Sequence, residues 1–170
     1  MSRPDPSEYG AYYGRYINLV PEGPIVTVLR DQIAETLKLL RALPEARGNH
    51  RYAPGKWSIK EIVGHVTDGE RVFAYRALRI GRGDETPLPG FEQDDYVKNG
   101  GFDSRPLGDL LDELETVRRA TVQLLAPLDE AAMLRRGTAS GFPVSVRALA
   151  YITAGHELHH RNILKERYLT

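Results

Sequence analysis

Three histidines, His65, His156 and His160, are the residues of this sequence best suited to bind a metal ion. His156 and His160 are four residues apart, so on a helix their imidazoles lie one above the other, about 6 Å apart, and can point at one ion. The pair follows the apolar stripe of its segment, and His65 lies at the edge of the apolar face of an earlier segment. Imidazoles buried in a core need a partner. The spacing therefore predicts a three-histidine metal site inside a helical protein.

The other two histidines, and a second interpretation of the same segment, are weaker candidates. His159 points away from the face shared by its neighbours and is expected at the surface or an interface, while His50 falls in a loop. Residues 156–160 also read HExxH, the zinc-binding helix of metalloproteases, with Glu157 as the base. Those enzymes take a third ligand from downstream, where residues 161–170 offer only Glu166. A metalloprotease is therefore the third choice.

Four segments carry apolar residues at helical spacing and must position these histidines. They span residues 25–43, 58–81, 107–125 and 146–167, and the second begins with a Ser58 and Glu61 capping box. The connections 44–57, 81–105 and 127–143 are longer than those between adjacent antiparallel helices, and they contain no clear strand pattern. The sequence predicts an all-α four-helix bundle with long crossover loops, as one domain over residues 1–170. Residues 1–24 form an arm that packs tyrosine rings on the bundle or contacts a ligand.

Composition narrows the function classes. The chain has 170 residues, zero net charge and no cysteine. Disulfides, thiol nucleophiles and thiolate metal sites are therefore excluded, and nucleic acid is not an expected partner. No stretch matches a signal peptide or approaches the ~18 apolar residues of a membrane helix, so we expect a cytoplasmic protein with no membrane contact.

Two blocks of sequence resemble the DinB/YfiT-like family of small four-helix metal-binding proteins. The first covers residues 57–70 and contains a histidine followed three and five residues later by acidic residues, here His65, Asp68 and Glu70. The second is the HxxxH element at His156 and His160. With helix order and length, the resemblance covers roughly residues 25–168.

The resemblance implies a divalent ion, Zn, Ni or Fe, held by His65, His156 and His160 with water completing the shell. It further implies a homodimer and reactions such as transfer to or from low-molecular-weight thiols. Three neutral imidazoles and an open position lower the pKa of a bound water or thiol, and a thiol cosubstrate would bring the sulfur that this chain lacks. The leading hypothesis is therefore a metal-dependent thiol S-transferase or hydrolase acting on a small electrophile.

The sequence does not decide the roles of several acidic residues. Asp68, three residues after His65, is expected to act as the catalytic base or to orient an imidazole. Glu157 is expected at the surface or in a dimer contact, with an approach to the site as the alternative. Glu70 is expected to pair with Arg71 or Arg76. The loop 89–102 mixes aromatic and acidic residues and suits a pocket lid or an inert surface loop.

Two alternatives to an enzyme remain open. One is a non-catalytic, stress-associated bundle in which the metal stabilises the fold. The other is a metal-free helical interaction module with the histidines packed in its core.

Overall fold

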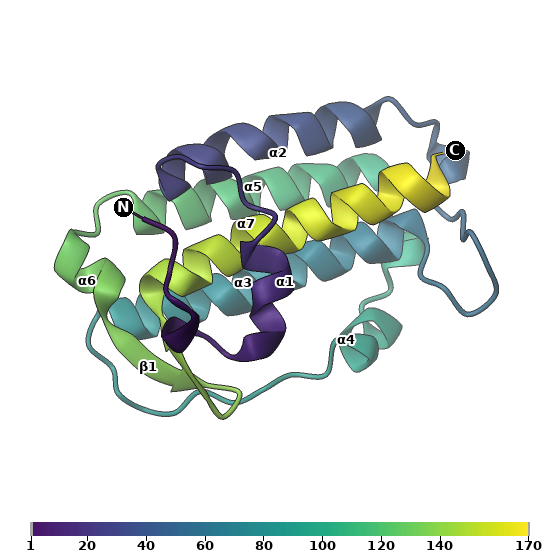
Figure 1. Ribbon diagram of the computed structural model, residues 1–170. Helices are drawn as coiled ribbons and strands as arrows, with labels where there is room; N and C mark the ends of the chain where they lie inside the picture. The colour runs from purple at the N-terminus through teal and green to yellow at the C-terminus, as the bar shows by residue number, and fades with distance from the viewer. Residues whose placement is uncertain (1, 170) are drawn as a thin grey trace.

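Four long helices that pack side by side make up most of the computed structural model, which describes residues 2–169 (Figure 1). They are α2 (Ile25–Arg41), α3 (Ile59–Gly81), α5 (Leu107–Leu125) and α7 (Val146–Ile163). The predicted capping box is present at the start of α3: the Glu61 amide donates to Ser58 Oγ at 3.0 Å, and the Ser58 amide donates to the Glu61 carboxylate at 2.7 Å. The predicted all-α four-helix bundle is confirmed.

The order of the helices creates the predicted crossover. Helix α3 packs against α5 and α7, and α2 packs against the same two helices, so α2 and α3 lie diagonally across the bundle. Helices α3 and α5 run in the same direction (Figure 1). Residues 82–106 must therefore return along the whole bundle, and they carry the short helix α4 (Gln93–Asn99) past one end of α3.

Short elements decorate the bundle, and the sequence did not predict them. They are α1 (Gly14–Ile17), α6 (Glu130–Leu134), five single turns of 3₁₀ or π helix, and an antiparallel hairpin of β1 (Arg136–Ala139) and β2 (Phe142–Ser145). The hairpin turns at Ser140 and Gly141, whose φ angles of 53° and 80° suit a two-residue turn. Leu88, in the crossover segment, pairs with Ala139 of β1 and so ties that segment to the hairpin. Strands of four residues carry too little alternation to be predicted from sequence.

The buried apolar residues form two clusters rather than one core. One cluster contains the first turns of α2, the second half of α3 and the first half of α7. The other contains the second half of α2, the first halves of α3 and α5, and the C-terminal turn Leu164–Tyr168. The buried residues also include polar ones, among them the three candidate histidines.

The N-terminal arm lies across α7. Helix α1 crosses it at Gly155, where a Cβ atom would overlap the backbone carbonyl of Tyr16, so only glycine allows this approach. Arg147 on α7 forms an ion pair with the buried Glu8, which also accepts a hydrogen bond from Ser145 Oγ at 2.7 Å. The arm is therefore fastened at both ends of its contact with α7.

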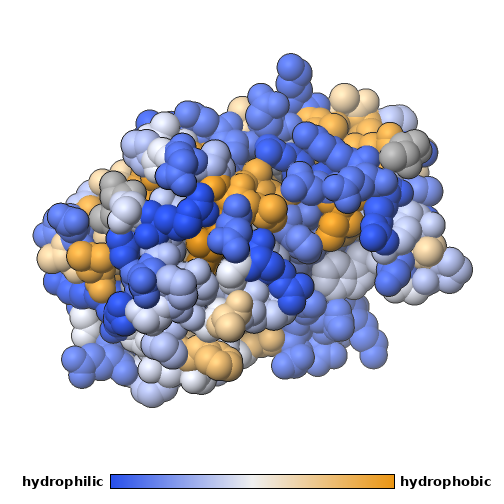
Figure 2. Space-filling model, viewed as in Figure 1, coloured by the Kyte–Doolittle hydropathy of each residue, from blue (hydrophilic) through white to orange (hydrophobic). Residues whose placement is uncertain are grey.

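No helix within residues 2–169 is both long enough and apolar enough to cross a membrane. On the face shown in Figure 2, apolar side chains form separate patches between hydrophilic ones.

Candidate metal centre

The structure brings His65, His156 and His160 together between α3 and α7. One ring nitrogen of each lies within 4.8 Å of the others, and His65 Nε2 is 3.0 Å from His156 Nε2. Two nitrogens bound to one zinc ion at tetrahedral angles would be about 3.3 Å apart. The donor set and its spacing therefore fit a divalent ion with little movement of the side chains.

Aromatic rings hold the imidazoles in place. Trp57 packs on His65 with ring centroids 4.7 Å apart and stacks on His160 at 6.5 Å. Tyr16 and Phe73 meet His156 edge-on at 5.4 and 5.7 Å. These contacts restrict the side-chain rotations, so little conformational entropy remains to be lost when a ligand binds.

Gly69 allows His156 to approach α3. A Cβ atom at position 69 would lie 3.0 Å from Cε1 and 3.3 Å from Nδ1 of the imidazole, which is closer than ordinary contacts allow. Helix α3 therefore has a glycine at the point where the His156 ring of α7 lies against it, although glycine lowers the helix propensity there.

Burial favours the neutral form of all three histidines, and neutral imidazole is the form that binds metal. Burial lowers the pKa of His65 to about 4. It also lowers the pKa values of His156 and His160 well below the ordinary value, and the neighbouring histidines add to the effect. A group of uncharged donors is what a divalent cation needs in a site of low polarity.

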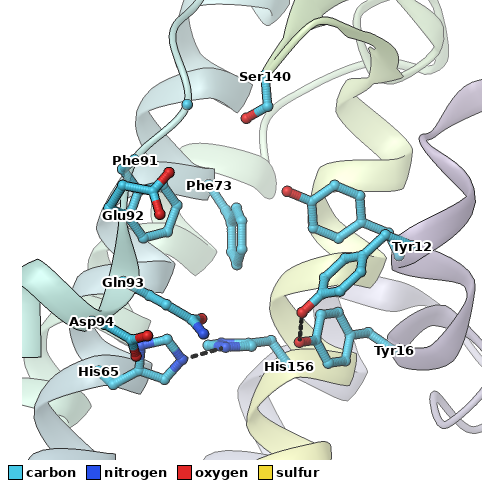
Figure 3. A pocket seen from close by; sticks show the side chains of 12 residues that line it. Tyr12, Tyr16, His65, Phe73, Phe91, Glu92, Gln93, Asp94, Ser140 and His156 are labelled. Atoms are coloured by element: carbon cyan, nitrogen blue, oxygen red, sulfur yellow. Dashed lines mark hydrogen bonds between the residues drawn. The ribbon is translucent and has the colours of Figure 1, made fainter.

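Within residues 2–169, two cavities with room for a small molecule reach this centre. The larger has a volume of about 520 Å³, within the range of small-molecule sites, and contains His65 and His156 in its wall. Figure 3 shows these two imidazoles at its base, with Tyr12 and Tyr16 on one side and residues 91–94 on the other. The smaller has a volume of about 300 Å³ and reaches His160. The segment that the sequence marked as a lid or an inert loop therefore lines the larger cavity.

A family model described as the DinB superfamily matches residues 29–164, most of the chain. The chain belongs to the DinB superfamily. No curated protein sequence matches it.

Two solved structures share the fold of this DinB-superfamily chain. The first, YfiT from Bacillus subtilis, is described as a probable metal-dependent hydrolase with an unusual four-helix bundle topology. It is 16% identical with a TM-score of 0.68, and the alignment covers 97% of this chain and 90% of YfiT. The second is a mycothiol-dependent maleylpyruvate isomerase, also 16% identical, with a TM-score of 0.69 over 82% of this chain and 60% of the isomerase. At this level of identity the likeness establishes the fold.

The expectations for Glu157 and Glu70 were wrong. Both are buried in the middle of the bundle, where Arg118 of α5 joins them. Arg118 donates to both oxygens of Glu70 at 2.8 Å and to Glu157 at 2.6 Å. Gln32 and Thr36 donate to the remaining positions of Glu157. A carboxylate bound in this way is not free to act as a base, so the DinB-superfamily chain lacks the central feature of an HExxH protease.

Asp68 lies near the centre in sequence but has other partners. It accepts a hydrogen bond from Arg71 at 3.2 Å, and burial raises the pKa of its carboxyl group. Among residues 2–169, Asp68 lines neither of the two cavities that reach the histidines, whereas Asp94 at the start of α4 lines both. His159 is partly exposed and packs on Tyr16.

Sequence reasoning did not identify Trp57 and Phe73 as residues that shape the site. It covered Asp94 and Tyr16 only as members of the loop 89–102 and of the N-terminal arm, with no individual role. Phe73 and Tyr16 look like ordinary core residues in a sequence. The single tryptophan directly before the cap of α3 was a usable signal, because a large ring at that place must cover the first turns of the helix.

Proposed function

We propose that this protein is a metal-dependent enzyme whose divalent ion, Zn, Ni or Fe, is bound by His65, His156 and His160. When bound, such an ion lowers the pKa of a water or thiol ligand, so that a nucleophile is available near neutral pH. The observation that carries the proposal is the convergence of three buried, neutral imidazoles, two of which, His65 and His156, line a cavity of about 520 Å³. The reaction proposed is S-transfer or hydrolysis of a small electrophilic substrate.

The side chains of the cavity bind and orient the substrate. Tyr12, Tyr16 and Phe91 offer ring faces and edges to an organic molecule. Burial raises the pKa of Tyr16, so its hydroxyl stays protonated, within 3.2 Å of the Tyr12 hydroxyl. The Tyr16 phenol is therefore available as a hydrogen-bond donor and does not act as a base. Because the chain has no cysteine, any thiol must be a cosubstrate.

Two carboxylates are candidates for the base. Asp68 is the candidate indicated by the sequence, and its raised pKa is compatible with that role. Asp94 is supported by its position in the walls of both cavities. We expect Asp94→Asn to lower kcat more than Asp68→Asn does. The opposite order would support the sequence-based assignment of Asp68.

Metal analysis of protein purified without a histidine tag is the first test. We expect one equivalent of metal in the wild type and in His159→Ala, a control on the same helix, and loss of the metal in His65→Ala. Metal-loaded protein should then couple a low-molecular-weight thiol to monobromobimane faster than the His65→Ala variant. Substoichiometric metal in the wild type would refute the proposal.

The same samples test the non-catalytic alternative, which the burial of the three histidines favours. In that case chelation lowers the melting temperature strongly, while azide and thiols leave the spectrum of a cobalt-loaded sample unchanged. The proposed homodimer rests on the family resemblance alone and is checked by analytical ultracentrifugation. The proposed cytoplasmic location rests on the sequence alone and is checked by cell fractionation.

A further inference from the structure

We infer that the histidine centre receives two different molecules from two sides: a cationic, amine-bearing molecule in the larger cavity and a smaller, anionic molecule in the smaller one. This inference deepens the proposed function and rests on it, because a two-substrate reaction needs two separate places beside one centre.

The two cavities approach different ligands of the centre. The larger contains His65 and His156 in its wall, and the smaller contains His160. Asp94 is the residue that lines both, so it stands where the two cavities come closest. Molecules bound on the two sides would therefore both lie next to the imidazole cluster, separated by one side chain of α4.

The larger cavity has the chemistry of a site for a cation. Its wall contains five aromatic rings and the carboxylates of Glu92 and Asp94, and none of its described lining residues is lysine or arginine. Figure 3 shows Phe91 and Glu92 in the cavity wall opposite Tyr12 and Tyr16. Aromatic faces combined with carboxylates bind ammonium groups through cation–π attraction and ion pairing. Two carboxylates with no cationic side chain in the same described lining disfavour a carboxylate or phosphate ligand in the larger cavity.

Arginines outside the cavity already use the same rings. The Arg15 guanidinium lies 4.0 Å from the centroid of Tyr12, and that of Arg76 lies 5.9 Å from the centroid of Phe91. Arg76 is buried and donates to the backbone oxygen of Pro89 and to Ser140 Oγ, so part of its donor capacity is used within the protein. Guanidinium groups of the protein therefore already pack on two of the rings that line the larger cavity.

The smaller cavity lacks Glu92, and the one carboxylate of its described lining, that of Asp94, is offset by a lysine at the rim. Lys56 contributes its ammonium group, and it forms no ion pair among residues 2–169. Tyr52, Trp57 and Ile163 supply apolar surface around it. A compact molecule with one carboxylate and a short apolar part matches this lining, since the lysine would gain a partner and the apolar part would leave water.

A pair of probes with the same skeleton and opposite charge tests the inference. We would titrate 2-phenylethylammonium and 3-phenylpropionate into the full-length protein by isothermal calorimetry, and follow Trp57 fluorescence in parallel. Trp57 is the only tryptophan in the sequence, and it lines the smaller cavity but not the larger one. We expect both probes to bind at the same time, and only 3-phenylpropionate to change the fluorescence.

Two variants at exposed positions serve as controls for each other. Glu92→Gln should weaken 2-phenylethylammonium about fivefold and leave 3-phenylpropionate unchanged, and Lys56→Gln should do the reverse. Competition between the probes for one site, equal effects of each variant on both probes, or failure of either probe to bind would overturn the inference.

The titrations are run on both chelated and zinc-loaded protein. Binding of the two probes does not require the ion, so a failure of metal binding refutes the proposed function without deciding this result. One equivalent of metal together with a single probe site would refute this inference and leave the proposed function standing.

Discussion

Replacing Arg118 with methionine should destabilise the protein strongly, because it leaves two carboxylates buried without their cation. Arg118 is 1% exposed and binds both Glu70 and Glu157. Removing one partner of a buried ion pair costs about 3–5 kcal/mol. In a domain of this size each kcal/mol corresponds to a change of about 2–4 °C in Tm, so Arg118→Met should lower Tm by roughly 6–20 °C.

The neighbouring Arg119→Met is the matched control, since that side chain is exposed on the same helix and should change stability by less than about 0.5 kcal/mol. Adding Glu70→Gln and Glu157→Gln to Arg118→Met should recover at least half of the loss, because no buried charge then lacks a partner. Urea unfolding at pH 7 with circular dichroism measures each free energy. A loss below about 1 kcal/mol in Arg118→Met, or no recovery in the triple variant, would refute this account of the network.

Two further predictions concern the centre and the arm. Gly69→Ala should displace the His156 ring and so weaken zinc binding about tenfold, as measured by competition with a chromophoric chelator. The control Gly108→Ala adds a methyl group in open space, so it should bind zinc normally and gain about 0.5–1 kcal/mol of stability. Equal zinc affinity in both variants would contradict the steric argument. Burial alone would raise the pKa of Glu8, but its hydrogen bonds to Arg147 and Ser145 outweigh this effect and lower the pKa below 4.5. The stability that Glu8 contributes is therefore present above pH 4.5 and is lost as the pH falls through the lowered pKa, so the difference in Tm between wild type and Glu8→Gln should shrink between pH 7 and pH 3. A constant difference over that range would exclude the ionised Glu8 as its source.

The sequence was sufficient to predict the four helices and the meeting of the three histidines. Apolar spacing identifies which face of each helix is buried, and the i, i+4 pair of His156 and His160 lies on such a face. Placing His65 against the pair needed only the assumption that the inner faces of two helices pack together. These predictions depend on local periodicity, which a single sequence contains.

The partners of the acidic residues could not be predicted, because they depend on the order of helices around the bundle. Arg118 is 48 residues from Glu70 and 39 from Glu157, and a charged residue in a helix is ordinarily expected at the surface. The position of Asp94 depends on the path of a 25-residue connection, for which no periodicity exists. The hairpin that ties this connection down was missed for the same reason.

The role of Glu157 follows from what surrounds α7 rather than from the motif in which it occurs. Adjacent helical residues project about 100° apart, so His156 and Glu157 face different neighbours. Helix α7 packs on α3 with one face and on α2 with another, and both faces are buried. His156 and His160 therefore meet His65 of α3, while Glu157 meets Arg118, Gln32 and Thr36 inside the bundle. In a metalloprotease helix the glutamate must face the substrate cleft to act as a base. Here Glu157 is buried inside the bundle, so the same HExxH motif gives two candidate metal ligands and one structural ion pair.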